Sequence, residues 1–180
     1  MKKIVLIALL LWSLPGMAQI KSAHLVASGL TCSMCSKAIY KALEALPAVM
    51  TVEADIEHSA YDVVFKPGSD IAPDELKKAV EDAGFFVAAL DITVTVSNAA
   101  VANDAHINIG AATYHFIDVK GQTLNGDVKL TLVDKNYVPA GVHKKYGRKT
   151  SMKCFATGYM DSCCPQHEKG NNKRVYHVTI

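Results

Sequence analysis

The chain has 180 residues, a formal net charge of +2 at pH 7 and a 50% share of hydrophobic residues. That length is enough for one medium-sized domain or two small ones. No apolar stretch reaches the roughly 20 residues of a membrane-spanning helix, so the composition argues against an integral helical membrane protein.

The N-terminal residues predict a secretory signal peptide over 1–18. A short basic start precedes an apolar run from Ile4 to Leu14, and small residues stand before an expected cleavage after Ala18. No Cys lies near that cleavage site, so lipid attachment is not expected. We therefore expect a periplasmic or secreted protein without a membrane anchor.

Charge divides the remaining chain into an acidic and a basic half. Residues 19–92 hold six Lys and 11 Asp or Glu, a formal charge of −5, whereas residues 93–180 hold 11 Lys or Arg and six acidic residues, which is +5. We expect this asymmetry to serve mainly solubility, although it also suits attraction between the halves or docking on a basic partner.

Residues 22–92 alternate between the periodicities of strands and helices. One helix is expected over 33–46, and a second is expected to begin at Pro73 and stop at Gly84. Strands are expected over 22–28, 51–56, 61–66 and 85–90. This order of strand, helix, strand, strand, helix, strand is the ferredoxin-like βαββαβ arrangement.

Residues 93–112 are interpreted as a linker, because the stretch is rich in Ala and Asn and has no sustained period. Beyond it almost all signals are those of strands and turns. Strands are expected over 113–119, 128–132 and 174–180, with turns at 120–121, 125–126 and 139–141. The predicted fold class is α+β, with a βαββαβ domain followed by a small, mostly β barrel or sandwich over 113–180.

Two cysteines separated by two residues, Cys32 and Cys35, lie where the first strand ends and the first helix begins. Thiolates are soft ligands that select soft cations, and the backbone N–H groups at a helix start stabilise the charged thiolate. The first domain offers no second Cys or His pair, so linear or trigonal binding of Cu(I), Ag(I) or Hg(II) is favoured over a closed four-ligand zinc site.

The run Gly29-Leu30-Thr31-Cys32-Ser33-Met34-Cys35, in this order of elements and with Gly84-Phe85 after the second helix, resembles the heavy-metal-associated domain family. This family includes copper chaperones, the N-terminal domains of copper P-type ATPases and the periplasmic mercuric-ion scavenger. The resemblance covers residues 22–92, and Leu30 replaces the Met that is usual there.

The resemblance implies that Cys32 and Cys35 are metal ligands and that Phe85 lies beside the metal loop. It implies capture or transfer of Cu(I), with Hg(II), Ag(I) or Zn(II) as alternative ions, and no catalysis. A metal transporter or efflux component is the expected partner, and metal-bridged dimers are compatible with two accessible thiolates.

Other interpretations of this Cys pair stay open. An exported pair can oxidise to a structural disulfide, and Cys-x-x-Cys at a helix start also serves thiol-disulfide oxidoreductases. The Trp-Cys-Gly-Pro type of redox motif is absent, however, because Ser33 and Met34 fill the middle positions. A scavenger of Hg(II) is the other alternative to a copper carrier.

A second cluster of sulfur and imidazole side chains lies near the C-terminus. Its members are Met152, Cys154, Met160, Cys163, Cys164 and His167. They suit either a second soft-metal site or a disulfide from Cys154 to Cys163 or Cys164.

Four other histidines, namely His106, His115, His143 and His177, are scattered and are interpreted as packing or surface residues. The basic run over 144–149 is expected to be a solvated loop, not a nucleic-acid site. The chain shows no phosphate-binding loop and no nucleophile with a recognisable base, so an enzyme is not expected.

Overall fold

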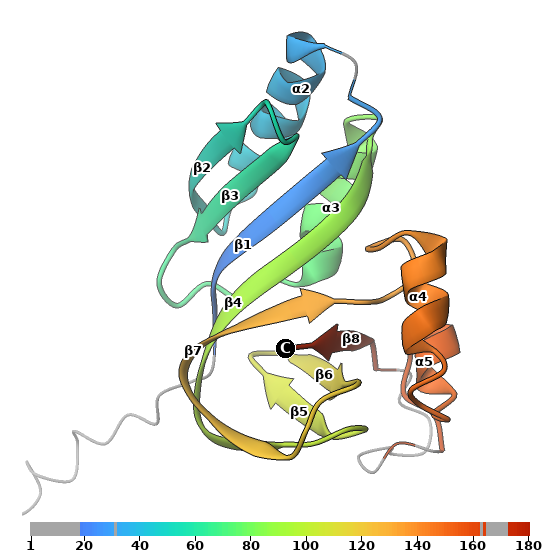
Figure 1. The fold of residues 1–180 in the computed structure, drawn as a ribbon. Helices are drawn as coiled ribbons and strands as arrows, with labels where there is room; N and C mark the ends of the chain where they lie inside the picture. The colour runs from blue at the N-terminus through green and yellow to red at the C-terminus, as the bar shows by residue number, and fades with distance from the viewer. Residues whose placement is uncertain (1–18, 31, 163, 165–172) are drawn as a thin grey trace, which may run out of the picture.

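The computed structural model describes residues 19–30, 32–162, 164 and 173–180. The predicted signal peptide lies outside these described residues, and its cleavage stays a prediction. Along the chain the elements are β1 (Gln19–Ser28), α2 (Ser33–Glu44), β2 (Val49–Asp55), β3 (Ala60–Phe65), α3 (Pro73–Asp82), β4 (Phe86–Val101), β5 (His106–Ile109), β6 (Ala112–Phe116), β7 (Gln122–Leu132), α4 (Ala140–Tyr146), α5 (Cys154–Thr157) and β8 (Val175–Thr179) (Figure 1).

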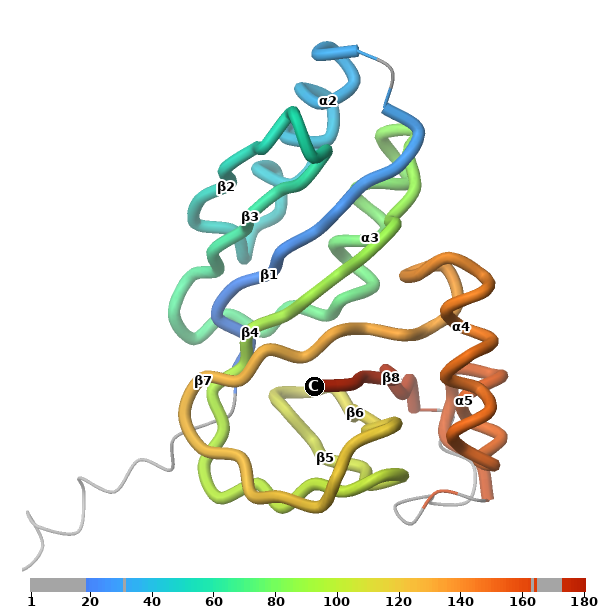
Figure 2. The backbone as a smooth tube through the Cα atoms, in the orientation of Figure 1, coloured from blue at the N-terminus to red at the C-terminus, as the bar shows by residue number. Residues whose placement is uncertain are grey.

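The strands form one mixed, eight-stranded sheet in the order β2-β3-β1-β4-β7-β8-β6-β5. Neighbouring strands run antiparallel except β6 and β8, which run parallel. Figure 2 shows β4 and β7 side by side around the bend that leads from the N-terminal to the C-terminal part. The sheet is therefore continuous between the two parts.

The N-terminal part has the predicted βαββαβ order. α2 buries Ile39 and Leu43 completely, and α3 begins at Pro73, a favoured first helical residue. The Glu75 carboxylate accepts a hydrogen bond from the Ala72 N–H at 2.9 Å, which satisfies one exposed donor at the start of α3. The predicted ferredoxin-like arrangement and the α+β fold class are confirmed.

Residues 93–112 are not an irregular linker, because they contain the second half of β4, the strand β5 and the turn after it. The register of β4 against β7 shifts after Val96, which marks a β-bulge. At the bulge Asn98 has φ 48°, and its N–H donates to the side-chain oxygen of Asn125 at 2.7 Å. The polar residues that suggested a linker thus form the bulge, and Asn125-Gly126, expected as a turn, lies within β7.

The C-terminal part is mostly β, as expected, but its strands form neither a closed barrel nor a separate sandwich. A βαββαβ unit leaves the outer side of β4 unpaired, and an unpaired strand edge is a template for a further strand. Here β7 pairs with that edge, and β8, β6 and β5 follow. The strands consequently extend the first sheet.

Two short helices also lie in this part. The basic run over 144–149, expected as a loop, begins within α4, and Pro139, expected in a turn, is its N-cap residue. α4 buries no residue, so its basic side chains are solvated as expected. In the part of the chain that the structure describes, no helix is both long enough and apolar enough to span a membrane.

A single hydrophobic cluster runs through both parts of the sheet, from Leu25 and Leu43 in the N-terminal part to Leu130 and Val178 in the C-terminal part. These four side chains have no exposed surface. Burial of apolar area is the main source of stability in such a core. We therefore expect the two parts to stabilise one another.

A polar contact also joins the two parts. Asp74, in the first turn of α3, accepts hydrogen bonds from Arg174 Nε at 3.0 Å and from the Tyr137 hydroxyl at 2.5 Å. Burial alone would raise the pKa of the Asp74 carboxyl, but Arg174 and Tyr137 outweigh it and hold that pKa below its ordinary value. Arg174 also lies 3.4 Å from Asp134.

Candidate metal site at Cys32 and Cys35

The Cys pair lies where the loop after β1 enters α2, with Cys32 just before the helix and Cys35 in its first turn. This loop is at the end of the molecule farthest from the C-terminal strands (Figure 1). Gly29, just after β1, has φ +90°, a conformation that L side chains rarely adopt. Leu30 is partly buried against the core, as expected for the residue that replaces the usual Met. Cys32 is the N-cap residue of α2 and has extended backbone angles, φ −161° and ψ 164°.

The two sulfur atoms face one another at 3.0 Å. That distance is longer than the roughly 2.05 Å of a disulfide bond. The first turn of α2 holds the pair, because Cys35 N–H donates to the Cys32 carbonyl oxygen at 3.0 Å. Cys32 is exposed and Cys35 half-buried, so the pair is accessible from solvent.

A buried hydrogen-bond network between α2 and β3 holds the first turn of α2 in place. The Ser36 hydroxyl lies 2.9 Å from the Tyr61 hydroxyl, which also donates to the Ser36 carbonyl oxygen at 3.3 Å. Ser36 is 3% exposed and Tyr61, on β3, is fully buried. This network ties the start of α2 to β3, which lies between β2 and β1 in the sheet. Sequence reasoning placed Tyr61 only as a strand residue, since no spacing relates it to Ser36.

Phe85 lies beside the metal loop, as the resemblance implied. A Cβ atom built on Gly29 would lie 3.9 Å from the Phe85 ring. The N–H of Phe85 donates to the Val80 carbonyl oxygen at 3.1 Å, which fixes the chain after α3. The ring is thus positioned by the end of α3 and covers the loop at Gly29.

α2 has no acidic residue in its first turn, so no carboxylate there offsets the positive end of the helix dipole. The Met34 side chain is 71% exposed, which fits a residue that is not needed as a ligand. Among the residues that the structure describes, no His, Asp, Glu or third Cys joins the pair in a possible metal cluster.

The second predicted cluster is only partly within the described residues, because Cys163 and His167 lie outside them. Cys154, Met160 and Cys164 are buried together with Val175, and Met152 packs against them. The structure thus brings together the described sulfur atoms that the sequence had placed near one another. Whether they serve a disulfide or a metal was left open by the sequence.

Two of the scattered histidines approach this cluster, which sequence reasoning missed. His106 and His115 face one another across the hairpin of β5 and β6, and His115 pairs in register with His177 of β8. Their rings were interpreted as packing or surface groups, yet His115 lies 3.6 Å from the Cys154 sulfur. The two-residue turn between Ile109 and Ala112 sets the pairing of β5 with β6 and so places His106 opposite His115. This turn was the sequence signal that could have predicted their meeting.

Comparison with protein families gives one match, the heavy-metal-associated domain, over residues 25–86. No curated protein matches the chain. Among solved structures, the chain is similar to the yeast copper transporter domain CCC2A, described in apo and Cu(I)-loaded states, with 28% identity, a TM-score of 0.33 and coverage of 36% of this chain and 88% of that one.

Two further similar structures are those of MerP and CopZ. Oxidized MerP from Ralstonia metallidurans CH34 is 29% identical, with a TM-score of 0.34 and coverage of 37% of this chain and 90% of that one. The CopZ metallochaperone is 27% identical, with a TM-score of 0.34 and coverage of 37% and 97%, respectively.

The fold and the loop together define a class: a ferredoxin-like domain that carries a Cys-x-x-Cys pair where its first strand meets its first helix. More particularly, residues 25–86 are a heavy-metal-associated domain, a heavy-metal-binding unit with the pair Cys32 and Cys35. The remaining C-terminal part matches no family.

Proposed function

We propose that this chain is an exported Cu(I) carrier or buffer, which holds the ion between Cys32 and Cys35 and passes it to a transporter or efflux component by ligand exchange. The observation that carries the proposal is the pair of sulfurs 3.0 Å apart at the start of α2, with Cys32 exposed and Cys35 half-buried. Two thiolates alone suit a soft ion of low coordination number.

Metal binding requires the sulfurs to separate. Two sulfurs bonded to one ion at about 2.3 Å are about 3.8 Å apart at a tetrahedral angle and about 4.6 Å apart in a linear arrangement. The gap must therefore widen from 3.0 Å. Cys32 is the exposed N-cap residue, so its side chain can rotate outward without disturbing the core, whereas Cys35 is held in the helix.

Accessibility supports transfer in preference to storage in a closed site. A partner thiolate must reach the ion and form a bond before a bond to the first protein breaks. The exposed Cys32 and the 71% exposed Met34 leave that approach open. The same opening allows two copies of the chain to share one ion, so metal-bridged dimers are expected at high protein concentration.

The proposal is tested by competition between the reduced protein and a chromophoric Cu(I) chelator. We expect Cys32→Ser/Cys35→Ser to bind one tight equivalent fewer than the wild-type protein. Met34→Ala, the matched control for a neighbouring sulfur, is expected to keep the wild-type stoichiometry. Tight Hg(II) binding with weak Cu(I) binding would instead favour a mercury scavenger. Reduction of insulin by the protein would favour an oxidoreductase and contradict the carrier. Mass determination of the secreted form, expected to begin at Gln19, tests export.

A further inference from the structure

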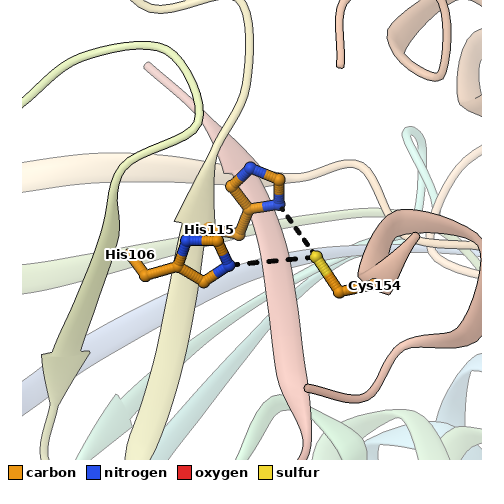
Figure 3. Close-up of side chains that lie close together, drawn as sticks. All are labelled: His106, His115 and Cys154. Carbon is orange, nitrogen blue, oxygen red and sulfur yellow. Dashed lines mark hydrogen bonds between the residues drawn. The ribbon is translucent and has the colours of Figure 1, made fainter. Parts of the chain in front are cut away.

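Three side chains from separate elements converge in the C-terminal part, as Figure 3 shows. His106 comes from β5, His115 from β6 and Cys154 from the first residue of α5. The Cys154 sulfur lies 3.8 Å from His106 Nε2 and 3.6 Å from His115 Nδ1. One potential ligand atom from each residue lies within 4.8 Å of the others.

We propose that His106, His115 and Cys154 bind a second metal ion, zinc or copper, at a site separate from Cys32 and Cys35. An ion bonded to sulfur at about 2.3 Å and to nitrogen at about 2.0–2.1 Å places these atoms about 3.5–3.8 Å apart at tetrahedral or trigonal angles. The two sulfur–nitrogen distances already have these values. This inference does not rest on the proposed function of the first site.

The hydrogen bonds around the histidines leave the correct nitrogens available. His106 Nδ1 lies 3.3 Å from the Asp104 carbonyl oxygen, and His115 Nε2 lies 3.0 Å from the Asp104 carboxylate. Both oxygens only accept, so those ring nitrogens carry the protons. The nitrogens without a proton are therefore His106 Nε2 and His115 Nδ1, the two that lie near the Cys154 sulfur. A carboxylate or carbonyl behind each imidazole is the usual outer support of a metal-bound histidine.

Asp104 supplies the hydrogen-bond acceptors for both histidines, because its backbone adopts an unusual conformation. Asp104 stands in the turn between β4 and β5 with φ 64°, a left-handed conformation that Asp and Asn tolerate best among residues with a side chain. Its N–H donates to the Phe116 carbonyl oxygen at 2.8 Å, which fixes the turn against β6. Its carbonyl can then serve one histidine and its carboxylate the other.

The three side chains form a ligand set for a soft or borderline ion. Neutral imidazole with thiolate is a ligand set for zinc and copper rather than for hard cations. Cys154 also packs in the sulfur-containing cluster with Met160 and Cys164.

Metal binding is expected to move one ring. The His106 and His115 rings are stacked at 4.3 Å with an interplanar angle of 9°. A nitrogen bonds a metal in the plane of its ring, so one ring must turn for both lone pairs to meet the ion. His106 is the less buried of the two and is expected to turn.

The test uses the full chain with Cys32→Ser/Cys35→Ser, reduced and metal-free, titrated separately with Co(II), Zn(II) and Cu(I). We expect one equivalent of Zn(II) or Cu(I). If Zn(II) binds, Co(II) is expected to show a thiolate-to-metal charge-transfer band that Zn(II) abolishes. Binding of Cu(I) without Co(II) or Zn(II) assigns the site to copper. Absence of any bound equivalent would overturn the proposal.

Variants in the same background identify the ligands. Cys154→Ser is expected to remove the charge-transfer band. Asp104→Asn, which keeps the backbone conformation, is expected to weaken metal binding about 10–100-fold. If Cys154→Ser does not fold, His106→Ala tests the site instead, because it removes only a half-buried ring. It is expected to weaken metal binding by at least about 10-fold. His24→Ala, which alters an exposed histidine paired with Asp62, is the control. Equal binding by His106→Ala and His24→Ala would refute the site.

Discussion

The network under the metal loop allows a quantitative prediction. Tyr61→Phe removes the hydroxyl that lies 2.9 Å from the Ser36 hydroxyl and 3.3 Å from the Ser36 carbonyl oxygen, in a region with almost no solvent access. A buried hydrogen bond contributes about 0.5–1.5 kcal/mol, and a partner left unsatisfied costs about 1–3 kcal/mol. We therefore expect Tyr61→Phe to lower the free energy of unfolding by about 1–2 kcal/mol.

A double-mutant cycle with Ser36→Ala isolates this interaction. Urea denaturation of the reduced, metal-free protein should give equal m-values for wild type, both single variants and Tyr61→Phe/Ser36→Ala. The coupling energy between Tyr61 and Ser36 is expected to be about 1 kcal/mol. Additive effects within about 0.3 kcal/mol would refute the reasoning, because they would show that the two hydroxyls do not stabilise one another.

Three further changes have defined outcomes. Because the pKa of Asp74 is depressed in the folded state from 3.8, its stabilising effect is present above that value and is lost as pH falls through the lower folded pKa. Urea denaturation of Asp74→Asn should show a weaker loss of stability in this acid range, and an unchanged profile would contradict the assignment. Leu43→Ala, at a fully buried position, should cost about 2–5 kcal/mol in a urea titration, and a cost below about 1 kcal/mol would show that the position is not core. Gly29→Ala, at φ +90°, should lower stability by about 1–2 kcal/mol through backbone strain, measured by thermal unfolding, whereas a neutral effect would show that the loop adopts another conformation.

The N-terminal fold could be predicted because its signals are local. Ser33 follows a Cys that starts a helix, Pro73 opens the second helix, and Gly84 with φ +90° follows it. Each signal depends on the conformation of one or two residues and needs no partner far along the chain. The contact between Phe85 and the metal loop came only from resemblance, because periodicity does not relate residues so far apart.

The C-terminal part could be predicted only as far as its strand content. Its architecture depends on which strand edge pairs with which strand, and the residues paired between β4 and β7 lie from 21 (Val101 and Gln122) to 40 (Asp91 and Thr131) positions apart in the chain. Asn98 looked like part of a linker because a bulge interrupts the period of two. His106, His115 and Cys154 meet because of the register of the β5–β6 hairpin and the position of α5 in the fold. The spacing of residues along the sequence does not predict the position of α5.

Copper K-edge X-ray absorption of the reduced wild-type protein, loaded with one equivalent of Cu(I), tests the central claim most directly. The pair Cys32 and Cys35 offers only sulfur, whereas the second site offers two imidazoles and one sulfur. We predict a first shell of sulfur with no imidazole scattering, and the loss of that shell in Cys32→Ser/Cys35→Ser. A first shell containing nitrogen in the wild-type protein would contradict the assignment of Cu(I) to the heavy-metal-associated domain.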